Sequence, residues 1–160
     1  MAVAGIDVQY HLPYVRQVDF SQNVVFNTKL DTNVASLTLF PGISQSVVNS
    51  VLNIKGIKGV VLETFGSGNA PTYPWFIDEL DAAIKRGLVV VNVTQCRGGA
   101  VNMESYETGL LLKRMGVITG LDITFEAAIV KLMFLFGQNY TVNEVKTQFE
   151  NSLAGEMGQN

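Results

Sequence analysis

The chain has 160 residues, of which 48% are hydrophobic and 16% are charged, and its formal net charge at pH 7 is −3. That length suits one compact domain, and the large hydrophobic share excludes an intrinsically disordered chain. The small negative charge, with no run of Lys and Arg longer than two residues, excludes the basic surface on which direct nucleic-acid binding depends.

No targeting or membrane-spanning segment is visible in the sequence. The opening "MAVAGIDVQYHLPY" has no basic stretch followed by a long apolar run, so it does not resemble a secretory signal. The longest apolar stretch, "AAIVKLMFLF", is interrupted by Lys131 and is far shorter than the roughly 20 residues that span a bilayer. The single cysteine, Cys96, excludes an internal disulfide. We therefore expect a cytoplasmic protein that binds no membrane.

Three strands are predicted in chain order. Residues 1–33 show little periodicity beyond a strand-like stretch in "NVVFNTK", and they are expected to form a linker or arm with an edge strand. Apolar residues then alternate from Val34 until Pro41-Gly42, which predicts a strand. The runs "GVVLETF" and "LVVVNV" predict two more strands, and their continuous apolar character indicates that both faces of the sheet are covered.

Five stretches have helical spacing with recognisable ends. Ser44, Thr124 and Thr141 are each placed to cap a helix, and Glu144 completes a capping box with Thr141. The tail "AGEMGQN" is expected to fray. The predicted helices are one from Ser44 to Gly56, one opened by Thr72 and Pro74 and closed by Gly87, one from about Ser105 to Met115 that Gly116 ends, one from Thr124 through Phe136, and one that follows Thr141.

Strands that alternate with helices predict an α/β fold. We expect a three-layer domain over residues 34–160, with a mostly parallel sheet of about four strands flanked by about four helices. Ligands of such sheets bind at the carboxyl ends of the strands. Three loops emerge there: "FPG" at 40–42, "FGSGNAP" at 65–71 and "TQCRGG" at 94–99.

The glycine turn in the second loop admits two interpretations. Gly66-Ser67-Gly68 begins like a dinucleotide-binding fingerprint, but Pro71 stands where the third glycine is needed, and no Lys-Ser/Thr pair follows. The favoured interpretation is a tight turn in which Gly66 and Gly68 adopt positive φ. That interpretation leaves Asn69 unexplained, because this amide can both donate and accept hydrogen bonds.

The residues provide no self-sufficient catalytic set. The single histidine, His11, lies in the expected arm, far along the chain from Ser67 and Cys96, and is expected to be an ordinary surface or linker residue. Cys96 follows a buried strand and is expected to be a small packed side chain. No cluster of Cys or His has metal-ligand spacing, so neither a metal nor a cofactor is expected. Four acids are expected to be solvated charges rather than a general acid and base: Asp78, Glu79, Glu104 and Glu107.

Three motifs in order resemble the C-terminal domain of bacterial type I, cytoplasmic L-asparaginases. They are "GSGNAP", "GLVVVNVTQCRGGAVNMESYETG" and "MGVITGLDITFEAAIVKLMFL", with "FPGIS" and "LAGE" at the two ends of the resemblance. The resemblance implies a two-domain enzyme that hydrolyses L-asparagine to L-aspartate and ammonia. Its two catalytic threonines would lie in an N-terminal domain, in Gly-Gly-Thr-Ile and Gly-Thr-Asp-Thr stretches that do not occur here. We therefore expect the isolated chain to be inactive.

The resemblance also implies specific roles for residues of this chain. Asn69, supported by Gly66, Ser67 and Gly68, would reach toward an asparagine molecule bound mainly by a neighbouring subunit of a homodimer or tetramer. The nearest match to an acid found after the third strand of periplasmic relatives is Glu104.

Some type I enzymes also have an allosteric asparagine site. It would involve Cys96 and Thr94, but the arginine that the family uses just before the glycine turn is Glu63 here. An acid would repel the carboxylate that a guanidinium binds, so we expect weak or absent allosteric control.

Two other functions remain open. The chain is also consistent with a domain of a related tRNA-amidotransferase subunit, in which another subunit would contact tRNA. It is equally consistent with a stand-alone amino-acid-binding module. The sequence does not separate asparagine from glutamine as the substrate.

Overall fold

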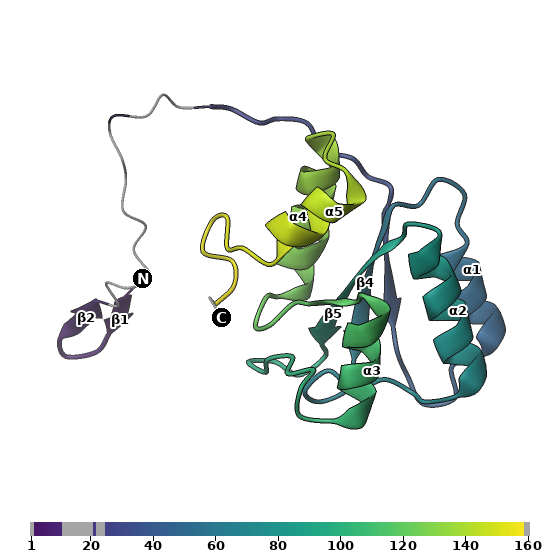
Figure 1. The fold of residues 1–160 in the computed structure, drawn as a ribbon. Coiled ribbons are helices and arrows are strands. Elements are labelled where there is room, and N and C mark those ends of the chain that lie inside the picture. Colours follow the sequence, from purple (N-terminus) through teal and green to yellow (C-terminus); the bar gives the residue numbers. More distant parts are fainter. Residues whose placement is uncertain (1, 11–20, 22–24, 159–160) are drawn as a thin grey trace.

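The computed structural model describes residues 2–10, 21 and 25–158, and it has the predicted α/β architecture (Figure 1). Four strands form one sheet in the order β3-β4-β5-β6, and all three neighbouring pairs are parallel. The strands are β3 (Val34–Thr38), β4 (Gly59–Thr64), β5 (Val89–Thr94) and β6 (Ile118–Thr119).

Five helices in the described residues cover the two faces of this sheet. Figure 1 shows α1, α2 and α3 on one face and α4 and α5 on the other, so the domain has three layers, as predicted. The helices are α1 (Gln45–Leu52), α2 (Pro74–Lys85), α3 (Glu107–Met115), α4 (Phe125–Gly137) and α5 (Val142–Phe149). No helix in these described ranges is long and apolar enough to cross a membrane.

The valine-rich strands are buried on both faces, as their composition predicts. In β5, Val90 packs into the core under α1 and α2, whereas Val89 and Val91 pack into the core under α4 and α5. All three side chains are fully buried. Successive side chains of a strand point to opposite faces, so a continuous apolar run supplies both cores.

The predicted helix caps are confirmed. The hydroxyls of Ser44 and Thr124 accept hydrogen bonds from backbone N–H groups in the first turns of α1 and α4. Thr141 and Glu144 form the capping box of α5. Gly116 ends α3 in the left-handed conformation, at φ 92°. These helix ends could be predicted from the sequence because a cap bonds to residues close to it along the chain.

The strand expected in the N-terminal arm needs correction. Residues 25–33 contain no strand, so the stretch in "NVVFNTK" is not one over its described part. Strands β1 (Ala2–Ala4) and β2 (Val8–Tyr10) pair with each other in a separate hairpin, and the fourth strand of the main sheet is the two-residue β6. His11 lies outside the described residues.

The last part of the expected linker is docked rather than extended. Asp31 N–H donates to the Met133 carbonyl at 2.9 Å, and the Asp31 carboxylate pairs with Lys58 at 2.7 Å. A Cβ on Gly137 would lie 2.2 Å from the Lys29 carbonyl oxygen, so a glycine is needed where the linker crosses the end of α4. The packed domain therefore begins a few residues before β3.

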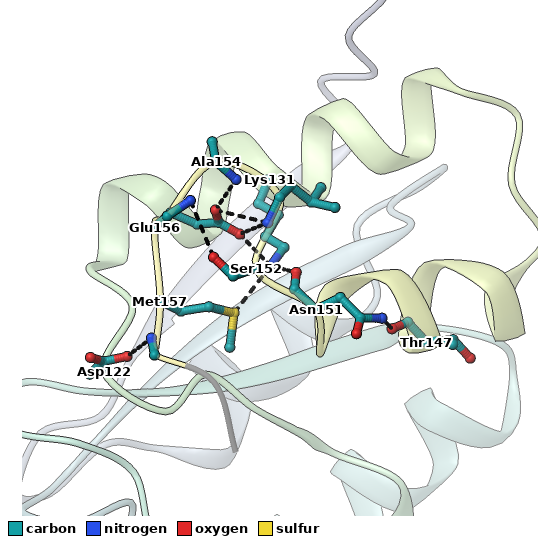
Figure 2. Close-up of polar contacts among 11 residues, drawn as sticks. Asp122, Lys131, Thr147, Asn151, Ser152, Ala154, Glu156 and Met157 are labelled. Atoms are coloured by element: carbon teal, nitrogen blue, oxygen red, sulfur yellow. Dashed lines mark hydrogen bonds and ion pairs between the residues drawn. The ribbon is translucent and has the colours of Figure 1, made fainter. Parts of the chain in front are cut away.

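The tail is also docked, contrary to the expectation of fraying. Glu156 forms an ion pair with Lys131 of α4 at 2.6 Å, and Met157 is buried against α4 and α5 (Figure 2). The Gly158 N–H donates to the Asp122 carboxylate at 2.6 Å. Residues 154–158 thus belong to the packed domain.

Candidate functional site

The glycine turn at 65–69 connects β4 to the loop before α2, at the carboxyl edge of the sheet. The Phe65 N–H donates to the Asn69 carbonyl at 2.9 Å, and the Phe65 carbonyl accepts from the N–H groups of Gly68 at 3.0 Å and Asn69 at 2.8 Å. Gly66 and Gly68 have φ of 53° and 107°, which confirms the prediction that both glycines supply positive φ. The N–H groups of Gly68 and Asn69 are used within the turn, which leaves neither of them to bind a phosphate.

Strand β5 anchors this turn through the buried Asn92 and the half-buried Thr94. The fully buried Asn92 donates from Nδ2 to the Gly68 carbonyl at 3.0 Å, and its Oδ1 accepts from the Thr64 hydroxyl at 2.6 Å. A buried amide that lacks partners is costly, so these bonds fix both the amide and the turn above it. The Thr94 hydroxyl adds a further bond to the Gly66 carbonyl.

The loop after β5 anchors the same turn from the side. The Asn102 N–H donates to the Ser67 carbonyl at 2.9 Å. Val101 lies so close to Gly68 that a Cβ there would be 2.7 Å from the Val101 Cγ1. Close approach as well as positive φ therefore requires glycine at position 68. The turn is held by contacts with β5 and with the loop after it, and it is well suited to present a side chain in a fixed orientation.

The side chain that this turn presents is Asn69. It is half-buried, so the amide is not sealed inside the protein. Its Oδ1 accepts a hydrogen bond of 2.9 Å from the hydroxyl of Thr108, the second residue of α3. Its Nδ2 has no hydrogen-bond partner among residues 2–10, 21 and 25–158. A fixed amide with an available donor is a suitable group to contact a polar ligand at this edge.

Two residues of the expected allosteric site, Glu63 and Thr94, lie near the carboxyl ends of β4 and β5, and Cys96 lies in the loop that follows β5. The Thr94 hydroxyl is occupied, because it donates to Gly66 and accepts from the Cys96 N–H at 3.0 Å. The Glu63 carboxylate is half-buried and accepts from the Thr38 hydroxyl. Cys96 is exposed, which corrects the expectation that it is a packed side chain.

The four acids considered as a general acid and base do not converge. Glu79 of α2 accepts hydrogen bonds from Gln45 and Asn49 of α1, and these bonds lower its pKa. Glu104 pairs with Lys113 at 2.6 Å, and this contact lowers the pKa of Glu104. The other two acids, Asp78 and Glu107, are exposed. Glu79 and Glu104 thus have separate partners, and no hydrogen bond joins any two of the four acids in the described part of the chain.

A cavity of about 660 Å³ lies at the opposite edge of the sheet. Its lining includes Lys58 and Leu88, which immediately precede β4 and β5, so the cavity opens at the amino ends of the strands. It shares no lining residue with the glycine turn. The candidate site is the rim of loops at the carboxyl ends of the strands, which carries the glycine turn and Asn69.

Sequence reasoning missed Thr108 and Asn92 as residues of this site. Asn92 left a signal, because one amide interrupts the run "VVVNV" in a strand that is otherwise fully apolar. Thr108 left none, because it follows the turn by 39 positions and an isolated threonine at a helix start is common.

Comparisons with known proteins show which family and fold this chain is similar to. Residues 33–149 match the glutaminase/asparaginase C-terminal domain family. The human 60 kDa lysophospholipase is 40% identical over 158 residues, and a glutamyl-tRNA(Gln) amidotransferase subunit of Methanococcus maripaludis strain C7 is 36% identical over 138. These alignments cover 98% and 86% of this chain but only 27% and 32% of the two relatives.

A solved structure shows the same fold at a comparable level of identity. The crystal structure of L-asparaginase I from Vibrio cholerae superposes with a TM-score of 0.85 at 40% identity. It matches 98% of this chain and 47% of the other. The chain thus spans about half of that enzyme and about a third or less of the two curated relatives.

Proposed function

This chain belongs to the glutaminase/asparaginase C-terminal domain family, and from that premise we propose that it is the C-terminal domain of an L-asparaginase. Such an enzyme hydrolyses L-asparagine to L-aspartate and ammonia. In this proposal the domain closes the active site of a neighbouring subunit in a cytoplasmic homodimer or tetramer. The similarity to L-asparaginase I over 98% of this chain supports the assignment.

The observation that carries the proposal is the state of Asn69. Its carboxamide is half-buried at the rim, its backbone is fixed by the turn, and its Nδ2 is available within the described part of the chain. A rigidly held polar group contributes to substrate orientation at little entropic cost. In this proposal the attacking threonine comes from a separate N-terminal domain.

Measurement of ammonia release tests whether catalysis needs the N-terminal domain. The isolated chain is expected to release no ammonia from asparagine, whereas the complete enzyme that includes it should do so. A coupled assay for ammonia measures both. Turnover by the isolated chain, after contaminating host enzyme is excluded, would show that the nucleophile lies within these 160 residues.

Substitution of Asn69 tests the role of the rim. In the complete enzyme, Asn69→Ala is expected to lower kcat/KM for asparagine by roughly tenfold to a hundredfold, the loss typical of a hydrogen bond to a charged ligand. Asn143→Ala, at an exposed position on α5, is the matched control and should leave kcat/KM unchanged. Equal activity of the two variants would remove Asn69 from the site.

The amidotransferase relative favours one alternative. In that case the domain would belong to a subunit that releases ammonia from an amide for transfer to charged tRNA. Assays of the complete protein with asparagine and glutamine, in the presence and absence of tRNA, separate the two functions. Activity that requires tRNA would favour the amidotransferase. Calorimetric titration of the isolated chain with both amino acids tests the third possibility, a stand-alone binding module.

Regulation of this enzyme by asparagine is proposed to be weak or absent. The acid Glu63 stands where the family uses arginine, and the Thr94 hydroxyl is already occupied within the rim. The complete enzyme should therefore show hyperbolic kinetics. Cooperative kinetics that Cys96→Ala abolishes would contradict this proposal.

A further inference from the structure

We propose that Thr108 is a positioning residue that holds the Asn69 carboxamide in place at this edge of the sheet. By holding Oδ1, it directs Nδ2 to an oxygen acceptor on the substrate, either a carboxylate or an amide carbonyl oxygen. This inference rests on the proposed function, because it assigns a ligand contact to the same rim.

A carboxamide has two ends of nearly equal shape and opposite hydrogen-bonding character. In the structure the Thr108 hydroxyl donates to Asn69 Oδ1 at 2.9 Å, which leaves Nδ2 as the available end. On the other side of the amide, a Cβ at Gly66 would lie 3.9 Å from Nδ2, so the turn leaves that end uncrowded. The Thr108 hydroxyl can also accept a hydrogen bond, so a reversed amide would keep a contact with Thr108 but would place an acceptor at the available position.

Thr108 can fix the amide because its own backbone is fixed. The next residue, Gly109, is so close to the loop before α3 that a Cβ there would lie 2.6 Å from the Met103 carbonyl oxygen. That same loop donates the Asn102 N–H to the Ser67 carbonyl in the glycine turn. Helix α3, the loop before it and the glycine turn are therefore each in contact with the other two. The β-branched threonine side chain also has few rotamers available in a helix.

The chemistry of the presented group limits what it can bind. Nδ2 only donates, so its direct partner is an oxygen rather than the substrate's ammonium group, which also only donates. An amino-acid amide offers such oxygens in its α-carboxylate and in its side-chain carbonyl. Thr108 would then influence turnover without touching the substrate.

Comparison of Asn69→Asp with Asn69→Ala in the complete enzyme tests the polarity. Asp retains an acceptor for Thr108 but replaces the donor with a negatively charged oxygen. We expect Asn69→Asp to have a lower kcat/KM for asparagine than Asn69→Ala, because the new carboxylate repels the substrate oxygen. An Asn69→Asp enzyme with near wild-type activity would mean that the group accepts from the ammonium, and it would overturn the inference.

Substitution of Thr108 tests the positioning. Thr108→Val keeps the shape and removes the hydroxyl, and it is expected to lower kcat/KM about three- to tenfold, the loss expected for one neutral hydrogen bond. Thr108→Ser restores the donor and should recover most of the activity. In the Asn69→Ala background, Thr108→Val should have no further effect, because its influence passes through the amide. An undiminished effect in that background would assign Thr108 a role independent of Asn69.

These outcomes separate failure of this inference from failure of the proposed function. If Asn69→Ala retains full activity, the proposed function of the rim fails. If Asn69→Ala loses activity but Thr108→Val does not, only the positioning role is wrong. Thermal unfolding of each variant identifies any general loss of fold. If Thr108→Val is unstable, Thr108→Ser and the comparison of Asn69→Asp with Asn69→Ala still decide the result.

Discussion

At the scale of single residues, the candidate site depends on a glycine that no other residue can replace without cost. Gly68 combines φ of 107° with close contacts to Val101 and to the Asn92 amide. Positive φ alone disfavours side chains, and the close contacts add a steric term. The turn thus approaches β5 closely enough for Asn92 to bond its backbone.

Gly68→Ala is expected to destabilise the chain by about 2–4 kcal/mol, from strained φ together with overlap of the new Cβ with Val101. Gly42→Ala is the matched control, because Gly42 has φ of 86° but a methyl group added to it would have no atom within 4 Å. It should cost only about 1 kcal/mol, the backbone term alone. Urea unfolding of both variants gives the difference, and equal losses would show that Val101 moves away freely.

At the scale of elements, α3 connects the loop after β5 to the glycine turn. Met103 is buried and its backbone lies directly against Gly109, so the first turn of α3 is seated on that loop. The ion pair between Glu104 and Lys113 is exposed and should contribute little. The contact between the backbones of Gly109 and Met103 therefore fixes the position of the first turn of α3, from which Thr108 bonds Asn69.

Gly109→Ala should reverse the usual effect of this substitution in a helix. Ala normally stabilises a helix interior by about 1 kcal/mol relative to Gly. Here the new methyl would lie 2.6–2.9 Å from three backbone atoms of Met103, so α3 must shift. We expect a net destabilisation of about 1–3 kcal/mol. Urea unfolding measures it, and a stabilised variant would show that α3 is not seated on this loop.

At the scale of the whole molecule, the C-terminal tail is joined to the core by a buried ion pair. Lys131 of α4 is 3% exposed at its side chain and bonds Glu156, the Asn151 carbonyl and the Met157 sulfur (Figure 2). Its ammonium also lies 4.7 Å from the centre of the Phe149 ring. These contacts fasten α4, α5 and the tail together on the face opposite α1, α2 and α3.

The carboxylate of this pair makes stability depend on pH. Burial raises the pKa of Glu156, but Lys131 and the N–H groups of Leu153 and Ala154 outweigh burial and lower it from 4.5 to about 2. A carboxyl with a depressed pKa in the folded state stabilises the fold above its unfolded pKa. This contribution, about 3 kcal/mol at neutral pH, should be lost as pH falls from about 4.5 to about 2.

Glu156→Gln should remove this part of the acid dependence. At pH 7 it is expected to cost about 3 kcal/mol, because it leaves the Lys131 ammonium buried without an anion. Near pH 2 the variant and the wild type should approach equal stability. Glu150→Gln, at an exposed acid that forms no ion pair in the described part of the chain, should preserve the wild-type profile. Parallel profiles for both variants, measured by urea unfolding across pH, would contradict the assignment.

The sequence predicted those parts of the fold that depend on near neighbours. The caps at Ser44 and Thr124, the box at Thr141 and the stop at Gly116 all formed as expected. Strand β6 was not found, because two residues are too few to show periodicity. The packing of the tail was not predicted, because nothing in a short polar segment with two glycines indicates that Lys131, 25 positions earlier, pairs with Glu156.

By itself, the sequence determined an α/β chain, its helix ends, the positive φ of Gly66 and Gly68, and Asn69 as the polar residue of the turn. These follow from backbone sterics, capping and periodicity, which act over a few residues. Only the tertiary structure decided that Asn92 supports the turn, that Thr108 holds the amide of Asn69, and that Glu156 neutralises Lys131. Those contacts join residues 20 to 40 positions apart, and the parallel sheet and its covering helices bring them together.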